Sequence, residues 1–394
     1  MLERLLMIEL CRTAQLQTAR ASRRDGVAHH QVPRDHTNGL GAVTLSACAG
    51  TAVGLIDSST EVALVLGMCA PERHTIARML SSGGSGAVIG EDVPAGEVAA
   101  RLQTLVRDFR TSNRVVIECP SATSSTDLIA RFTGARAATD PPVTFGPIVT
   151  VVDASHLMFD LDRRDYVEGE DGQPFPVPWA QVTVTQIENA TVLPIVNWRH
   201  FPRAQLTELL SLLSHLNPSA RLKLVGSGWA RQVNLDWNQR ATVGGTAGWI
   251  RILRDQHEPH VRDPRVSSFR YEQLRPLHPG RVAQTLLTQF DREEVGHIVR
   301  SVGLCRIASR PAMVGKWEQA GAMITFAPLA PARSPAGQSL GQEIAFIGFD
   351  LNPGLIRSRL DSCALTEDEF TAGPAAWVHY PDPIPHWDPR NMNR

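Results

Sequence analysis

The sequence has 394 residues, of which 43% are hydrophobic and 20% charged, and its formal net charge is −1. This length is enough for two or three domains with sizeable cores, and the composition is ordinary for a globular protein. Because there is no overall basic field, we expect no direct sequence-specific binding of nucleic acid. No apolar run reaches the roughly 18–20 residues that a membrane span needs, so we expect no membrane partner.

The six cysteines are scattered and form no C-x-x-C pair. This spacing argues against a disulfide scaffold or a thiolate zinc site, and it favours a reducing, cytoplasmic compartment. Cys69 and Cys119 are each single and distant in sequence, which is typical of small buried side chains rather than metal ligands.

The first 41 residues are polar and lean basic, and Glu3 and Glu9 argue against a secretory signal. We predict a mobile N-terminal tail at 1–41; the alternative is a basic arm that contacts RNA or a partner.

A first domain is predicted at 42–233, where short apolar runs alternate with helical patterns. Amphipathic spacing predicts helices at 98–109 and 205–216, and Asp153 is placed to cap a helix after its strand. Residues 83–86 predict a flexible turn. Alternating strands and helices indicate an α/β layer with a mostly parallel sheet. The predicted strands are 42–46, 62–66, 114–118, 148–152, 192–196 and 222–225.

Residues 234–264 are rich in Gly, Arg, His and Asp, and they predict an interdomain linker. His257 and His260 lie there, but two histidines supply at most half of a closed zinc site, so solvated loop histidines are favoured. A smaller second domain follows at 265–394, with a Pro/Ala/Gly-rich loop at 328–341. Its predicted strands are 268–273, 301–308 and 343–349, and its predicted helices are 281–290 and 354–363.

Residues 43–60 read VTLSACAGTAVGLIDSST, which has the shape of a phosphate-binding loop entry: an apolar strand end, small residues and a helix-like run. A working loop of this kind is G-x-x-x-x-G-K-[ST], whose lysine meets the phosphates and whose hydroxyl holds Mg²⁺. The Gly-Lys-Ser/Thr triplet is missing from this stretch, so we expect its loop to have lost its catalytic chemistry.

Four ordered segments of the C-terminal third resemble one known family. They resemble the C-terminal domain of the CobW-type P-loop GTPases, which are mostly metal-insertion chaperones or metal-homeostasis factors. The resemblance implies a P-loop-NTPase-like α/β domain followed by a smaller α+β CobW C-terminal domain. VTVVDASHL (149–157) and QVTVTQIENA (181–190) support it more weakly in the first domain. The four segments are SFRYEQLRPLHPGR (268–281), GLCRIASRPAMVGKWEQAGAMITFAP (303–328), QEIAFIGFDLNPGLIRSRLDSCALTEDEF (342–370) and WVHYPDPIPHWD (377–388).

When residues 43–60 are aligned with the family's phosphate loop, Gly50 retains one of its glycines. Ala52 replaces the second glycine, Val53 replaces the lysine, and Gly54 replaces the Mg²⁺-binding threonine. The family's Cys-x-Cys-Cys metal motif is absent from residues 87–102. The resemblance therefore gives no metal ligand and no catalytic residue in this chain.

Glu118 survives in VVIECPSATSS, but Pro120 removes a backbone N–H that could have met a γ-phosphate. Asn197 survives in PIVNWRHF, where no aspartate is present to read guanine. Together with Gly50, these two residues are the predicted remnant of a nucleotide site.

Arg275, His278 and Arg281 match the family's RPLHP-x-R segment and are candidates for a partner surface. The alternative is a capped, hydrogen-bonded turn around Pro276 and Pro279.

These losses favour a non-catalytic adaptor in zinc homeostasis or stress that needs no cofactor. Its partner would be a protein or ribosome-associated factor, since an actinobacterial branch of the family resembles factors that recruit a hibernation factor to ribosomes. The alternative is a GTP-dependent zinc metallochaperone with non-standard site residues, which would need GTP, Mg²⁺ and zinc. A third interpretation is a metal-sensing regulator that uses histidines of the linker and tail. The oligomeric state stays open.

Overall fold

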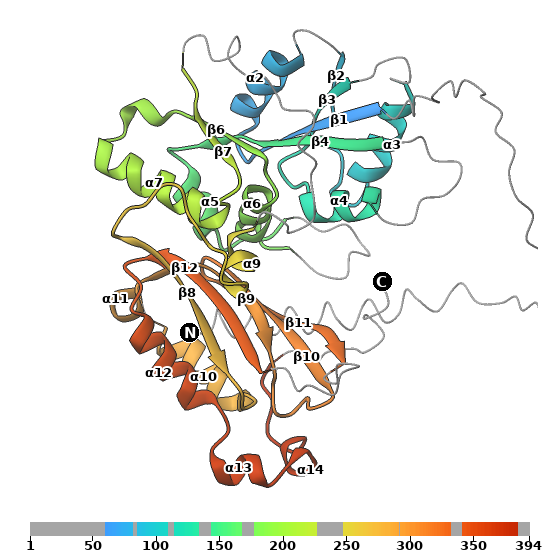
Figure 1. Cartoon of the computed structure of the whole chain (residues 1–394). Helices are drawn as coiled ribbons and strands as arrows, with labels where there is room; N and C mark the ends of the chain where they lie inside the picture. Colours follow the sequence, from blue (N-terminus) through green and yellow to red (C-terminus); the bar gives the residue numbers. More distant parts are fainter. Residues whose placement is uncertain are drawn as a thin grey trace, which may run out of the picture.

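The computed structural model describes residues 60–81, 85–108, 114–133, 143–167, 177–226, 247–290, 292–331 and 341–384. They form a seven-stranded sheet flanked by helices and a five-stranded sheet packed against it (Figure 1). The predicted tail, the predicted strand at 42–46 and most of the predicted linker lie outside the described residues.

The seven-stranded sheet is parallel throughout its described pairs, which confirms the predicted α/β layer. Its order is β2-β3-β1-β4-β6-β5, with β7 also paired to β6, so β1 lies between β3 and β4. The residues expected to form a turn at 83–86 partly belong to β2. The strands are β1 (Thr60–Leu66), β2 (Ser85–Val88), β3 (Arg114–Glu118), β4 (Val143–Thr150), β5 (Val152–Asp153), β6 (Val192–Val196) and β7 (Arg221–Leu224).

Strand β1 is apolar from Val62 to Leu66 because both of its faces are covered there. Val62, Leu64 and Leu66 pack with α3 and α4, whereas Ala63 and Val65 pack with α2. A continuous apolar run is what a parallel strand buried on both faces requires. The helices of this domain are α2 (Ala70–Ser81), α3 (Val98–Asp108), α4 (Ser125–Thr133), α5 (Leu157–Asp162), α6 (Trp179–Glu188) and α7 (Arg203–Leu216), with a 3₁₀ turn η1 (Trp198–His200).

The second sheet is antiparallel, in the order β11-β10-β9-β12-β8. The predicted strands and helices of this domain are confirmed with small shifts at their ends, but the β10–β11 hairpin was not predicted. The elements are β8 (Val266–Gln273), β9 (His297–Cys305), β10 (Met313–Ala320), β11 (Met323–Pro331), β12 (Gln342–Phe349), α10 (Pro279–Thr288), α11 (Arg292–Val295), α12 (Pro353–Cys363), α13 (Glu367–Thr371) and α14 (Pro374–Trp377).

The two sheets share one apolar core rather than being separated by a free linker. Helix α9 (Gly248–Leu253) lies within the segment predicted as linker and contributes Ile252 to this core. The same core contains Leu212 and Leu213 of α7 together with Val299 and Ile347 of the second sheet. The description of 234–264 as a simple linker is therefore wrong for its C-terminal part.

The two histidines of the predicted linker differ in their exposure to solvent. His260 is exposed, although its backbone N–H donates to Ser214 Oγ at 2.8 Å. His257 is only partly exposed, and its Nε2 lies 3.3 Å from Nδ1 of the buried His215. His257 was expected in solvent, and this expectation is wrong because α7 covers one side of its ring.

This histidine pair predicts an acid-sensitive stability. Burial lowers the pKa of both His215 and His257 to about 4, whereas an unfolded histidine titrates near 6.5. Between these values the unfolded chain binds more protons, so the free energy of unfolding should fall as the pH drops from 6.5 towards 4. We expect His257→Gln to reduce this dependence by about 1–2 kcal/mol, measured by urea denaturation at pH 7 and pH 4.5. The control is His200→Gln in η1, an exposed position; an unchanged pH dependence in His257→Gln would contradict the assignment.

Among the residues that the structure describes, no helix is both long enough and apolar enough to cross a bilayer.

Candidate functional site

The turn from β1 to α2 occupies the position where ligands bind in folds of this kind. In an open parallel sheet, ligands bind at the carboxyl ends of the strands beside the point where strand order reverses. Here that point lies beside β1, and residues 67–69 connect β1 to α2. Gly67 has a φ of +140°, and a Cβ there would lie 2.5 Å from the carbonyl oxygen of Val151. The turn therefore lies tightly against the end of β4.

This topology corrects the placement of the phosphate-loop position. A phosphate-binding loop joins a strand to a helix, and the central strand is β1, so the equivalent position follows Leu66 rather than Val43. The assignment to residues 43–60 is wrong, and residues 43–59 lie outside the described residues. The correct segment reads GMCAPERHT and also has no lysine. The whole sequence contains two lysines, Lys223 in β7 and Lys316 in β10.

On one side of this turn, Arg73 of α2 is fully engaged by neighbouring groups. Its side chain is 2% exposed, and its Nε donates to Oε1 of Glu118 at 3.2 Å. Its Nη1 donates to the Gly67 carbonyl at 2.6 Å and to Ser121 Oγ at 2.9 Å, and its Nη2 pairs with Glu91.

Glu118 ends β3, where NTPases of this fold place the carboxylate that serves Mg²⁺. Its second carboxylate oxygen, Oε2, lies 3.0 Å from Nδ1 of His74. Both oxygens of Glu118 are thus held by side chains of α2, and a guanidinium of the protein itself neutralises this carboxylate.

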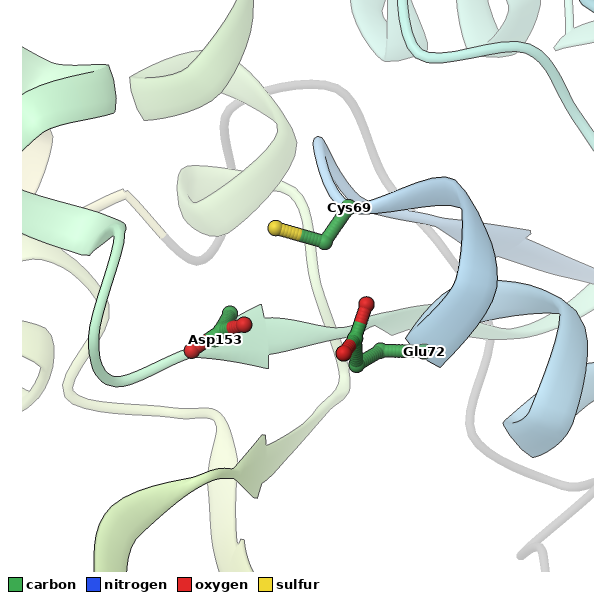
Figure 2. A group of neighbouring side chains, drawn as sticks. All are labelled: Cys69, Glu72 and Asp153. Atoms are coloured by element: carbon green, nitrogen blue, oxygen red, sulfur yellow. The ribbon is translucent and has the colours of Figure 1, made fainter. Parts of the chain in front are cut away.

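On the other side of the turn, acidic and thiol groups line a small pocket. Cys69, in the turn, and Asp153, at the end of β5, line this pocket, and Glu72 in the first turn of α2 lies beside them (Figure 2). Their potential ligand atoms all lie within 4.8 Å of one another. Asp160 of α5 and Gln186 of α6 line the same pocket as Cys69 and Asp153.

Asn197 holds the two carboxylates in place. Its Nδ2 donates to Asp153 Oδ2 at 2.8 Å and to Glu72 Oε1 at 3.3 Å. Ser155 donates to the other oxygen of Asp153 from both its backbone and its hydroxyl. The predicted capping role of Asp153 is therefore wrong: His156 is the N-cap of α5, and the Asp153 side chain instead faces the pocket and the Ser155 turn.

The pocket has a negative electrostatic character. Burial, reinforced by Asp153, Asp160 and Glu72, raises the pKa of the Cys69 thiol to about 12. Burial alone would raise the pKa of Asp153, but hydrogen bonds from Ser155 and Asn197 outweigh it and hold that pKa below its usual value. Burial raises the pKa of Asp160. Such a set of groups repels a phosphate and attracts a cation.

Comparison with known proteins identifies the C-terminal domain. Residues 266–364 match the model of the cobalamin synthesis protein cobW C-terminal domain. The sequence is 26% identical over 265 residues to "Zinc-regulated GTPase metalloprotein activator 1" of Dictyostelium discoideum, and the match spans 60% of this chain and 55% of that protein. Residues 266–364 therefore form a CobW C-terminal domain, as the resemblance of this part of the sequence implied. The matched part thus spans about half the length of this curated relative.

Two solved structures are also similar to this chain. The zinc-bound YjiA GTPase of E. coli is 15% identical, with a TM-score of 0.36 and coverage of 78% of this chain and 99% of that one. A zinc-bound triple mutant of the same GTPase gives a TM-score of 0.37 at the same identity and coverage.

The predicted remnant residues of the CobW-type nucleotide site fall in different places. Gly50 lies outside the described residues. Glu118 ends β3 and pairs with Arg73, while Asn197 follows β6 and contacts Asp153. The two therefore face opposite sides of the turn after β1, each against side chains of the protein.

Arg275, His278 and Arg281 are held within the CobW C-terminal domain. Arg281 forms a two-pronged pair with Glu369 at 2.8 and 2.6 Å, and Arg275 pairs with Glu367. His278 caps α10 and stacks on a tyrosine ring. These side chains fasten α13 and the following segment, so the capped-turn alternative describes them better than a partner surface.

Sequence reasoning missed Cys69, Glu72 and Arg73. Cys119 is fully buried as expected, whereas Cys69 is partly exposed and lines the pocket. The sequence signal was Cys69 followed closely by the adjacent opposite charges of Glu72 and Arg73. These residues lie at the start of a helix, directly after a buried strand.

Proposed function

We propose that this CobW-type chain neither binds nor hydrolyses GTP and acts by binding another macromolecule in zinc homeostasis. The observation that carries the proposal is the charge of the phosphate-loop position. The turn after β1 has no lysine, its carboxylate Glu118 is neutralised by Arg73, and Cys69, Glu72 and Asp153 line its other side. A triphosphate placed there would meet carboxylates instead of the cations that P-loop NTPases supply.

The partner class is a protein or a ribosome-associated factor, as the family resemblance implies. An adaptor of this kind works through its surfaces, so it can keep the fold after losing the chemistry. The name of the Dictyostelium relative describes a GTPase metalloprotein activator, and a GTP-dependent zinc metallochaperone is the competing function.

Calorimetric titration of the full chain with GTP and GDP in Mg²⁺ tests this proposal. We expect no binding, because the loop offers no lysine and its carboxylates oppose the phosphates. ATP serves as the specificity control, and an active P-loop GTPase in the same buffer serves as the positive control. Binding of GTP tighter than about 100 μM, or about 5.5 kcal/mol, would rule out the proposal in favour of the metallochaperone.

The adaptor role has its own test. Purified ribosomes from zinc-starved and zinc-replete cells are sedimented with the chain, without nucleotide. We expect co-sedimentation with the ribosomes of starved cells. Sedimentation that requires GTP would favour the competing function, and the absence of binding to either preparation would exclude the ribosome as the partner.

A further inference from the structure

We propose that Cys69, Glu72 and Asp153 form a zinc-binding site at the switch point of the parallel sheet. The three residues come from the β1–α2 turn, the first turn of α2 and the end of β5, so the fold brings together groups that are distant in sequence. This set differs from the Cys-x-Cys-Cys of the family resemblance, which residues 87–102 lack.

The spacing suits one small cation. Zinc bonds of about 2.0–2.3 Å in tetrahedral geometry place ligand atoms about 3.5 Å apart. The three donor atoms already lie within 4.8 Å of one another, so rotation of the side chains is sufficient to close the site. Asp160 lines the same pocket as Cys69 and Asp153, and its charge acts on the Cys69 thiol.

A second observation points independently to a ligand in this pocket. Gln186 is fully buried, and its Nε2 donates to the carbonyls of Ser121 and Thr123 at 3.0 and 2.9 Å. Within the part of the chain that the structure describes, its Oε1 has no hydrogen-bond partner, although Gln186 lines the pocket together with Cys69 and Asp153. A buried acceptor without a partner costs about 1–3 kcal/mol, and a metal or its bound water would satisfy it.

The donor chemistry selects the class of metal. A thiolate with carboxylates favours zinc over Mg²⁺ or Ca²⁺, which prefer oxygen ligands alone. On binding, the Cys69 thiol gives its proton to solvent, and the resulting thiolate and the two carboxylates place three negative charges around the doubly charged ion. Asn197 orients both carboxylates, in the way that outer hydrogen bonds fix the ligands of metal sites.

This inference does not depend on the proposed function, because zinc and GTP are measured separately. Zinc binding without GTP binding supports both the zinc site and the proposed function. Zinc binding together with GTP binding would remove the proposed function and leave the site standing.

The test uses the full, metal-free, reduced chain with zinc alone as the probe. Among the described cysteines Cys69 is the one that is not buried, so iodoacetamide labelling followed by peptide mass spectrometry reports on it directly. We expect one equivalent of zinc to slow alkylation of Cys69 at least tenfold. Co²⁺ should give a sulfur-to-metal charge-transfer absorption band, and equimolar zinc should remove that band.

Variants locate the ion. Cys69→Ser and Asp153→Asn should each weaken zinc binding at least tenfold, as measured by calorimetry. The matched controls are Glu208→Gln, an acidic residue of α7 remote from the pocket, and Cys11→Ser combined with Cys48→Ser. Unchanged zinc affinity in Cys69→Ser, or no zinc protection of Cys69 in the unmodified chain, would overturn the proposal. The labelling experiment needs no variant, so it decides the question even if Asp153→Asn folds poorly.

Discussion

Replacement of Arg300 by methionine is expected to lower the free energy of unfolding by about 3–5 kcal/mol. Arg300 of β9 is 1% exposed and bonds Glu188, the last residue of α6, at 2.9 and 3.1 Å. It also bonds Glu318 of β10 at 3.0 Å. Removal of the guanidinium leaves the carboxylate of Glu188 buried without its arginine at the junction of the two sheets. Urea denaturation followed by tryptophan fluorescence measures the loss.

The pH dependence of this loss identifies its cause. Burial raises the pKa of Glu188 even with Arg300 present, so in Arg300→Met this carboxyl becomes protonated readily. The deficit relative to the unmodified chain should therefore shrink when the pH is lowered from 8 to 5. In Arg300→Met, Glu318 keeps Lys316 as a partner, so most of the cost comes from Glu188. The double variant Arg300→Met with Glu188→Gln should therefore recover part of the lost stability.

Arg114→Met is the control for the Arg300 variant. Arg114 pairs with Glu61 at the exposed start of β3, where such a pair contributes less than about 1 kcal/mol. Equal losses in the two variants would mean that the buried cluster does not hold the sheets together.

The parallel sheet could be predicted because long runs within its strands β1 and β6 are apolar on both faces. The run VALVL of β1 and the strand VLPIV of β6 have no polar residue that would disguise them. The β10–β11 hairpin was missed for the opposite reason. Glu318 is buried in β10 because Arg300 neutralises it, and with Lys316 it interrupts the apolar alternation that marks a half-buried strand.

The site could be predicted only in part because its contacts join distant segments. Glu118 was identifiable as the polar end of a buried strand, but its partner Arg73 lies 45 residues earlier. The phosphate-loop position was assigned too early because residues 43–60 and 60–81 both combine apolar residues, small residues and a helix-like run. Only the strand order distinguishes them, and strand order is a property of the folded sheet.

Arg73→Met is expected to cost a similar amount, about 3–5 kcal/mol, because it removes the cation that Glu118 and Glu91 share. Glu118 is 3% exposed, so water cannot replace the guanidinium. Arg73→Lys should recover only part of the loss, since a single ammonium cannot reproduce the bonds to Glu118, the Gly67 carbonyl and Ser121 together. Urea denaturation measures the loss in the free energy of unfolding, and hydrogen exchange shows which segments of the chain are destabilised.

Hydrogen exchange in Arg73→Met should accelerate first in the β1–α2 turn and at the end of β3, where the guanidinium joins the two segments. Arg78→Met is the matched control, because Arg78 is exposed on the same helix and lies one turn beyond the site. A loss in Arg73→Met no larger than in Arg78→Met would show that the guanidinium is dispensable there. Glu118 would then be available to Mg²⁺, and the strongest structural objection to a nucleotide at this position would disappear.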